Sequence, residues 1–459
     1  MQITIDELIE RARNAQKIVE FWPQEKVDEM TVAAGWETYQ QADEIARLAF
    51  EETGMGVYEH KLLKHQKKTL GVLRDLDGVR TTGVIEEDHE KGLIKFAKPV
   101  GVIGALTPVT NCEATLPSKG LPAIKCRNAI IFAPHPRAKK TAFMVTESLR
   151  RGLSKVGAPL DLIQTIEEPS IIFAKELMAK VDLVVATGGG AMVQSAYSSG
   201  TPAYGVGAGN AAVIVDETAD LESAADKIYQ GKTFDNATSC SSENSLILLE
   251  EIYTQMISEL ENQGGYFCNT EERARLKQLM WPDGEHLNTS IVAQPVSKIA
   301  ELAEIQMGAD KAYLMVEGEA VGHEDPFCKE KLSLVLTIWK KPNFEEAVDL
   351  VQRILDFNGR GHSCGIHTQN ESRIRYLGER IRASRIMVNQ PHSLGNSGNY
   401  NNGMPFTLTL GCGTWGGNIT TENVHWKHFL NITWVSKPIE PVVPDMDKIF
   451  GAYWEKFGK

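Results

Sequence analysis

Apolar residues recur along this chain at two different spacings, and the spacing changes near Val84. Between residues 5 and 73 they recur at helical spacing among charged residues, for example in 33–51, which predicts a series of amphipathic helices. Residues 85–96 have the pattern of a strand pair that turns at Lys91 and Gly92. The chain is therefore expected to open with helices and to continue with strands.

From residue 100 onward, short apolar runs alternate with helical patterns, and a second series of this kind runs from 211–215 to about Phe406. This alternation is typical of an α/β fold, in which helices cover parallel sheets on both faces. Residues 434–444 are proline-rich and predict an extended arm that packs on a neighbour. The first series comprises strands at 100–107, 128–133, 162–166 and 183–187, and helices at 113–124 (weakened by Pro117 and Pro122), 139–155, 171–179 and 191–198.

The composition excludes several classes of protein. With 459 residues the chain is too long for one hydrophobic core, so two or three domains are expected. A net charge of −12 argues against nucleic-acid binding, which needs clustered lysine and arginine. No apolar run reaches about 18 residues, and the start lacks the layout of a signal peptide. Seven cysteines with scattered spacing fit a reducing compartment. We therefore expect a cytoplasmic enzyme with no membrane or nucleic-acid partner.

Cys240 lies in a segment of small polar residues, 234–244, just before a short apolar strand. No second cysteine lies within three positions, so metal-pair and redox CxxC motifs are excluded. A substrate carbon could reach a thiol in such a loop. Free cysteines are more often buried structural residues, and the local sequence alone favours that interpretation.

Three glycine-rich segments, 187–190, 205–210 and 410–418, are candidates for ligand contact. The first two fail the GxGxxG fingerprint, because Val193 and Asn210 stand where its last glycine would be. The first follows a strand and opens a helix, where backbone N–H groups can hold a phosphate, but ordinary tight turns explain both equally well. The third segment suggests a backbone that lies close to a ligand or to another segment.

Together these segments resemble the CoA-acylating aldehyde dehydrogenases, and the matches occur in the same order between residues 110 and 423. The resemblance implies the aldehyde dehydrogenase fold, with two Rossmann-like parallel-sheet domains and a small β oligomerisation arm. It also implies a homodimer or homotetramer. The matching segments are 110–111, 128–137, 187–190, 205–210, 232–237, 239–240, 330–333, 361–362, 410–418 and 422–423. The implied cofactor-binding domain is 1–84, 98–210 and 407–433, the implied catalytic domain is 211–406, and the implied arm is 85–97 and 434–459.

The resemblance implies that Cys240 is the nucleophile, which attacks the aldehyde carbon. Asn111 matches the asparagine whose side-chain amide, with the backbone N–H of Cys240, forms the oxyanion hole. By itself Asn111 would be interpreted as a turn residue or a helix cap. His362 could orient or deprotonate the CoA thiol, although a loop histidine satisfied by backbone carbonyls is equally plausible.

The implied cofactor is NAD or NADP, with NADP slightly favoured, and no metal is expected. His135 and Arg137 replace a glutamate of the hydrolytic enzymes and offer partners for a 2′-phosphate. Glu330 matches the glutamate that holds the nicotinamide ribose, although its neighbours could also form a solvated charged loop. The other cofactor contacts implied by the resemblance are Thr107, Pro108, Thr187, Gly188, Gly189, Gly190 and Gly207.

The segment 206–210 departs from the hydrolytic branch in an informative way. Hydrolytic aldehyde dehydrogenases carry a glutamate there that activates the deacylating water, whereas this chain has no carboxylate in the segment. The thioester on Cys240 should therefore wait for a better nucleophile, and the CoA thiol fits. We expect an acyl-CoA product and a ping-pong sequence.

The aldehyde is harder to predict. Residues 383–403 are rich in amides, which suggests a polar or anionic aldehyde held by residues such as Arg360, His392 and Asn396. Residues 422–431 are also similar to acylating sulfoacetaldehyde dehydrogenases, so sulfoacetaldehyde is favoured over acetaldehyde or another short aldehyde. Against a strongly anionic substrate, no lysine or arginine occurs between 386 and 426; a sulfonate would need amides, His392, or a cation such as Arg360 or Arg385. The amides could also belong to a flexible loop.

Three rival interpretations remain open on the sequence. A hydrolytic aldehyde dehydrogenase would form product without CoA. An enzyme similar to γ-glutamyl phosphate reductase uses a thiol on the same fold, but its acyl phosphate would demand more basic residues than the active-site segments contain. A catalytically silent oligomeric binding protein would require Cys240 to be inert.

Overall fold

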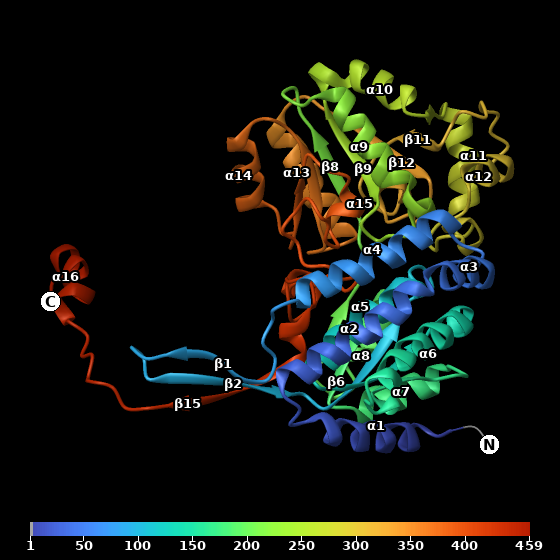
Figure 1. The fold of residues 1–459 in the computed structure, drawn as a ribbon. Helices are drawn as coiled ribbons and strands as arrows, with labels where there is room; N and C mark the ends of the chain where they lie inside the picture. Colours follow the sequence, from blue (N-terminus) through green and yellow to red (C-terminus); the bar gives the residue numbers. More distant parts are fainter. Residues whose placement is uncertain (1–2) are drawn as a thin grey trace.

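The computed structural model describes residues 3–459 and contains two stacked α/β bodies and a projecting arm (Figure 1). As the helical spacing predicts, helices come first. Thr4 begins the first of them with a capping box, in which its side chain accepts from the backbone N–H of Glu7. The four helices are α1 (Ile5–Val19), α2 (Gln24–Gln40), α3 (Ala42–Thr53) and α4 (Tyr58–Leu76).

The first body is built on a parallel five-stranded sheet of order β5-β4-β3-β6-β7. The predicted strands and helices of this region are confirmed. One strand, β7, was not predicted, because Gly205 and Val206 belong to a segment interpreted as a glycine-rich loop. The strands are β3 (Val102–Thr107), β4 (Ala129–Pro134), β5 (Ile163–Thr165), β6 (Leu183–Thr187) and β7 (Ala203–Val206). The helices are α5 (Cys112–Lys125), α6 (Lys139–Lys155), α7 (Ile171–Lys180) and α8 (Gly190–Tyr197).

Helix α5 forms despite Pro117 and Pro122 in its interior. Proline has no N–H, so Pro117 leaves the carbonyl of Glu113, one turn earlier, without its helical partner. The Nδ1 atom of His65, on α4, lies 2.8 Å from that carbonyl oxygen and satisfies it. The contact attaches α4 to α5 at the start of the helix that follows Asn111.

The second body contains a parallel seven-stranded sheet of order β10-β11-β12-β9-β8-β13-β14. Each body has its own buried apolar cluster. The strands are β8 (Ala211–Val215), β9 (Glu243–Leu249), β10 (Gly265–Phe267), β11 (Tyr313–Glu317), β12 (Val335–Lys341), β13 (Cys364–His367) and β14 (Ile386–Val388). The helices are α9 (Leu221–Thr233), α10 (Tyr253–Asn262), α11 (Thr270–Met280), α12 (Val296–Leu302), α13 (Phe344–Phe357), α14 (Glu371–Arg380) and α15 (His392–Gly395).

The arm is an antiparallel sheet of order β1-β2-β15 that projects from the first body (Figure 1). The predicted strand pair is confirmed as β1 (Gly83–Asp88) and β2 (Leu93–Pro99), and β15 (Leu430–Ser436) pairs with β2. The extended segment predicted after Trp434 ends in a helix that was not predicted, α16 (Met446–Phe457). This helix begins because the Asp445 side chain accepts from the N–H groups of Asp447 and Lys448.

Within residues 3–459, no helix is both long and apolar enough to cross a membrane.

The two sheets present opposite ends to the space between the bodies. Thr107 and Thr187 lie at the carboxyl ends of β3 and β6 in the first sheet. Cys240 and His362 precede β9 and β13, at the amino ends of strands of the second sheet. The first body therefore presents the carboxyl ends of its strands to this space, as expected for ligand binding in α/β folds. The second body presents the loops that lead into the amino ends of its own strands.

Candidate active site

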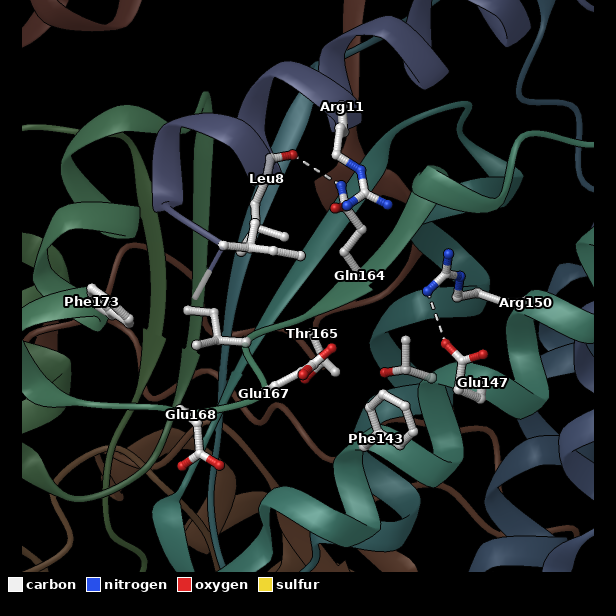
Figure 2. Close-up of a pocket in the computed structure, with 13 residues that line it drawn as sticks. Leu8, Arg11, Phe143, Glu147, Arg150, Gln164, Thr165, Glu167, Glu168 and Phe173 are labelled. Atoms are coloured by element: carbon white, nitrogen blue, oxygen red, sulfur yellow. Dashed lines mark hydrogen bonds and ion pairs between the residues drawn. The ribbon is translucent and has the colours of Figure 1, made fainter. Parts of the chain in front are cut away.

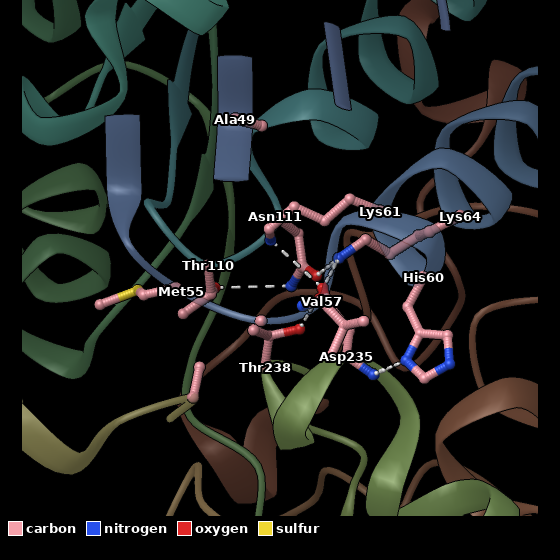
Figure 3. A network of polar contacts seen from close by, with 12 residues as sticks. Ala49, Met55, Val57, His60, Lys61, Lys64, Thr110, Asn111, Asp235 and Thr238 are labelled. Carbon is pink, nitrogen blue, oxygen red and sulfur yellow. Dashed lines mark hydrogen bonds and ion pairs between the residues drawn. The ribbon is translucent and has the colours of Figure 1, made fainter. Parts of the chain in front are cut away.

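The loop that carries Cys240 is shaped by an unusual run of backbone conformations. Asp235, Asn236 and Ala237 have φ values of 52°, 51° and 60°, a left-handed conformation that is costly for residues other than glycine. Their surroundings fix this conformation. Asp235 accepts from the backbone N–H of Val57, and it pairs with two lysines of α4 (Figure 3). The turn leads the chain from α9 to Cys240.

Cys240 differs from the other cysteines in its exposure. Among the described residues it is the one cysteine that is not fully buried. Its surroundings nevertheless disfavour the thiolate: burial and then the nearby carboxyl of Glu330 raise the pKa of the Cys240 thiol to about 12. The free protein therefore holds a protonated thiol at neutral pH, and a nearby acceptor is needed to activate it.

His362 supplies an acceptor of this kind. Its Nε2 atom lies 3.3 Å from Sγ of Cys240, and its Nδ1 atom lies 2.7 Å from Oγ of Ser363. Burial holds the pKa of His362 well below its usual value, so the ring is neutral. If Nδ1–H donates to Ser363, the lone pair of Nε2 faces the thiol. Both ring nitrogens of His362 thus contact side chains. The alternative interpretation, a loop histidine that hydrogen-bonds to backbone carbonyls, does not describe this ring.

Asn396 takes part in the same chain of contacts. Its Nδ2 atom donates to Oγ of Ser363 at 2.7 Å, so that Asn396, Ser363, His362 and Cys240 form one series. Asn396 is fully buried, and among residues 3–459 its Oδ1 atom has no hydrogen-bond partner. The structure thus places Asn396 on the side of His362 that faces away from Cys240.

Asn111 occupies the N-cap position of α5, but its side chain does not cap the helix. Its Oδ1 atom instead accepts from Nζ of Lys64 at 2.7 Å, and Lys64 is held by Glu113 at 2.9 Å and Asp235 at 2.5 Å (Figure 3). A lysine can only donate, so it selects the oxygen end of the amide. The Nδ2 group is left with only a long 3.5 Å contact to Thr110. An amide in this orientation can donate to an oxyanion.

Glu330 places a carboxyl group beside segment 206–210, which contains no carboxylate of its own. Its Oε1 atom accepts from the backbone N–H of Gly209 at 3.3 Å. Burial raises the pKa of Glu330 to about 8, so the group is mostly protonated at neutral pH. A protonated carboxyl group cannot take a proton from water, and the segment 206–210 therefore lacks a ready general base even with Glu330 beside it.

A cleft of about 660 Å³ lies between the two bodies and is lined by Gly190, Gly207, Arg360 and Trp415. A Cβ atom added to Gly189, Gly190 or Gly207 would meet nothing within 4 Å. The packing of the chain itself therefore does not require glycine there, which fits the close approach of a nucleotide. The backbone around Gly416 lies against Arg360, so the third glycine-rich segment approaches another segment, one of its two expected roles.

The remaining residues expected at the cofactor lie at strand ends of the first sheet. Thr107 and Pro108 are at the end of β3, and Thr187 and Gly188 are at the end of β6. His135 and Arg137 follow β4. Nδ1 of His135 accepts from the backbone N–H of Arg137, and Nη2 of Arg137 donates to the carbonyl of Thr53 at 2.9 Å.

The structure does not bring the three residues expected at the aldehyde together. Arg360 lines the cleft between the two bodies, whereas His392 is buried with Nδ1 2.7 Å from the carbonyl oxygen of Ser241. A separate narrow cavity, of about 30 Å³, lies in front of Asn111 and Ser239. Lysines of α4 line this cavity. They were not predicted as site residues, because α4 is distant along the chain from Asn111 and Ser239. The signal was a set of lysines at helical spacing, Lys61, Lys64, Lys67 and Lys68.

Two further features lie outside this site. A cavity of about 530 Å³ between α1, β5 and α6 is lined by Arg11, Phe143 and Gln164, and none of the expected site residues lines it (Figure 2). Glu422, His425 and His428 bring potential metal-ligand atoms within 4.8 Å of one another. Within residues 3–459, none of these three hydrogen-bonds to Cys240 or His362.

The comparisons with known proteins agree with this geometry. The aldehyde dehydrogenase family model matches residues 2–264. A sulfoacetaldehyde dehydrogenase of an Acholeplasma species is 49% identical, over 97% of this chain and 93% of the relative. The acylating sulfoacetaldehyde dehydrogenase of Bilophila wadsworthia is 47% identical, over 99% and 100%. The acetylating succinate-semialdehyde dehydrogenase of Clostridium kluyveri is 41% identical, over 98% and 99%.

Solved structures show the same fold. An acetylating aldehyde dehydrogenase from Geobacillus thermoglucosidasius has a TM-score of 0.93 at 37% identity, covering 96% of this chain and 98% of that one. The propionaldehyde dehydrogenase of Rhodopseudomonas palustris with bound propionyl-CoA has a TM-score of 0.86 at 27% identity, covering 95% of each chain. An engineered glycolyl-CoA reductase with bound NADP+ has a TM-score of 0.86 at 26% identity, covering 95% and 97%.

The expected α/β architecture is thus confirmed, and the chain belongs to the CoA-acylating branch of the aldehyde dehydrogenase family.

Proposed function

We propose that this protein oxidises sulfoacetaldehyde to sulfoacetyl-CoA with NAD+ or NADP+, through a thioester on Cys240. The observation that carries the proposal is the contact of 3.3 Å between the Cys240 thiol and a neutral His362, close to a segment without an ionised carboxylate. The sulfoacetaldehyde dehydrogenases among the relatives support the choice of substrate.

In the first step, the Cys240 thiol passes its proton to Nε2 of His362 as sulfur attacks the aldehyde carbon. The carbonyl oxygen becomes an oxyanion, which accepts hydrogen bonds from Nδ2 of Asn111 and from the backbone N–H of Cys240. Removing one donor of this kind typically costs about 3 to 4 kcal/mol of transition-state stabilisation. Hydride transfer to the nicotinamide ring, the chemistry that the cofactor supplies when bound, leaves an acyl group on sulfur.

In the second step, the CoA thiol attacks the thioester carbon, and the Cys240 thiolate leaves. His362, having released its first proton to solvent, is placed to accept the proton of the CoA thiol. Water competes poorly, because Glu330 is held protonated and cannot activate it. The relative solved with bound propionyl-CoA supports CoA as the acyl acceptor.

For the cofactor, we propose that Gly188 to Gly190 and Gly207 lie against the diphosphate and that Glu330 binds the nicotinamide ribose. His135 and Arg137 are placed to contact the adenosine ribose, and the positive charge of the Arg137 guanidinium would suit a 2′-phosphate. Replacing Arg137 with glutamine should therefore raise the KM for NADP+ more than the KM for NAD+. Equal effects on the two cofactors would remove the argument for NADP+.

The proposal is tested by assaying sulfoacetaldehyde, acetaldehyde and succinate semialdehyde with and without CoA, separately with NAD+ and NADP+. We expect the highest kcat/KM for sulfoacetaldehyde and formation of product only with CoA. Release of a free acid at the same rate without CoA would instead identify a hydrolytic enzyme. The Cys240→Ser variant serves as the inactive control.

A pre-steady-state experiment locates the action of His362. Because the ring contacts Cys240, the His362→Ala variant should slow the first burst of reduced cofactor as well as CoA-dependent turnover. A normal burst with slow turnover would restrict His362 to the CoA thiol. A normal burst with normal turnover would exclude it from both steps.

A further inference from the structure

The narrow cavity in front of Asn111 is lined on one side by Lys64, Lys67 and Lys68 of α4. On its other sides lie hydroxyl groups, including those of Ser239 and Ser397. The cavity is lined by Ser239, which immediately precedes Cys240, and by Asn111, so it lies next to the loop that carries the thiol. Its volume of about 30 Å³ leaves room for a short substrate only.

The lysines of this helix differ in how their charges are balanced. Lys61 and Lys64 pair with the carboxylates of Asp235 and Glu113. Among the described residues, no carboxylate lies within 4.0 Å of Lys67 or Lys68. The cavity therefore contains positive charge that the protein does not neutralise, which is costly unless an anion supplies the balance.

The environment of Lys68 illustrates this cost. Its ammonium group is buried and donates to the carbonyl and hydroxyl oxygens of Ser397 and to the carbonyl of Gly398, at 2.7 to 3.0 Å. Burial, followed by the charges of Lys67 and Lys64, holds the pKa of Lys68 well below its usual value. Its hydrogen-bonding groups are used by Ser397 and Gly398, so Lys68 acts on a ligand by positioning Ser397.

Lys67 is available for direct contact. It is half-buried, and its ammonium group lies 5.7 Å from the ring of Tyr400 and has no hydrogen-bond acceptor among residues 3–459. The hydroxyl of Ser397 accepts from Lys68 and that of Ser239 accepts from the N–H of Ser241. Neither hydroxyl has an acceptor for its own proton in the described chain, so both can donate to a ligand.

We infer that this cavity is the binding site for the negatively charged end of the aldehyde, with Lys67 as its direct partner and Ser239 and Ser397 as hydroxyl donors. The inference rests on the proposed function and specifies it: the substrate is a short aldehyde with a sulfonate or carboxylate group. Residues 386–426 contain no lysine or arginine, and in this site the cation comes from α4 instead. Lys67 is a specificity-determining residue and takes no part in the bond changes at Cys240.

The test compares an anionic with a neutral aldehyde. Replacing Lys67 with methionine, which keeps the length of the side chain but removes its charge, should lower kcat/KM for sulfoacetaldehyde by about 10- to 100-fold, the value of a hydrogen bond to a charged group. The kcat/KM for acetaldehyde should change by less than about threefold, since acetaldehyde has no group to contact Lys67. Lys67→Arg should retain most of the activity on sulfoacetaldehyde.

Lys17→Gln, a substitution of an exposed lysine on α1, is the matched control and should change neither value. An equal loss with both aldehydes, or no loss with sulfoacetaldehyde, would overturn the inference while leaving the proposed function intact. A different outcome is a wild type that prefers succinate semialdehyde over sulfoacetaldehyde and depends on Lys67. That result would support the anion site and overturn the assignment of the substrate.

Discussion

At the scale of single residues, the chemistry depends on the environment of Cys240. The same burial that orders the loop also opposes ionisation of the thiol. Activation must therefore come from a neighbour, and the neutral ring of His362 at 3.3 Å is placed to provide it. We therefore expect the thiol to reach full reactivity only with substrate bound, when proton transfer accompanies attack.

This environment predicts how the free enzyme reacts with iodoacetamide. With a pKa of about 12 for Cys240, the thiolate fraction should rise about tenfold for each pH unit up to at least pH 10. The alkylation rate, followed by mass spectrometry, should therefore keep rising where an ordinary cysteine reaches a plateau. Cys240→Ser provides the background, because the other six cysteines are buried. A plateau near pH 8 would show that the thiol is already activated in the free enzyme.

A second prediction at this scale concerns Asn111. Replacing it with alanine should lower kcat by about 100- to 1000-fold, because one donor to the oxyanion is lost. The melting temperature should fall only slightly, since the side chain does not cap α5 and Lys64 keeps its ion pairs with Glu113 and Asp235. If Asn111 were mainly a helix cap, the same variant would lose about 1 kcal/mol of stability and keep most of its activity.

At the scale of elements, the glycine-rich segments have different physical roles. A Cβ atom at Gly209 would collide with the carbonyl oxygen of Cys240, whereas one at Gly207 would meet nothing within 4 Å. Gly209 is therefore required by the packing of two loops of the protein. Gly207 is free of such constraints and lines the cleft between the two bodies, where we propose that the cofactor binds.

The two glycines form a matched pair of variants. Gly209→Ala should displace the Cys240 loop and reduce kcat/KM for every aldehyde, together with a lower melting temperature. Gly207→Ala should leave the melting temperature unchanged and raise the KM for the nicotinamide cofactor. If both variants lowered stability equally, the assignment of Gly207 to a ligand surface would be wrong.

At the scale of the whole molecule, the arm and α16 expose apolar side chains that one copy of the chain cannot bury. An exposed apolar surface of this extent marks a contact with another protein, and we propose a second copy of this chain. The apolar positions of α16 recur at helical spacing on one face. The exposed apolar residues of the segment are Ile432, Trp434, Val435, Ile439, Val442, Val443, Met446, Ile449, Phe450, Tyr453 and Phe457.

Replacing Ile449 and Phe450 with glutamate should therefore reduce the mass of the assembly, measured by light scattering, because charges would be buried in the contact. Glu455→Gln, on the same helix but outside its apolar row, should leave the mass unchanged. An unchanged mass for the double variant would exclude α16 from the assembly.

Much of this architecture could be predicted from local pattern. Helix 139–155 coincides with α6, and strand 183–187 coincides with β6, because both depend on the spacing of apolar residues within one element. Helix α16 was missed, since the prolines before it dominate the local composition. Strand β7 was missed because glycine is weak evidence for a strand, although Gly205 is held there by Tyr197, whose hydroxyl lies 3.0 Å from its N–H.

The sequence by itself determined the α/β class and the absence of a carboxylate in 206–210, and it predicted Cys240 as the nucleophile through the match to the family. Only the tertiary structure decided that His362 faces Cys240, that Lys64 orients Asn111, and that lysines of α4 line the cavity in front of Asn111. The physical reason is that periodicity reports on neighbours within one element. The active site instead joins the carboxyl ends of one sheet to the amino ends of another, and this requires both bodies to be packed together.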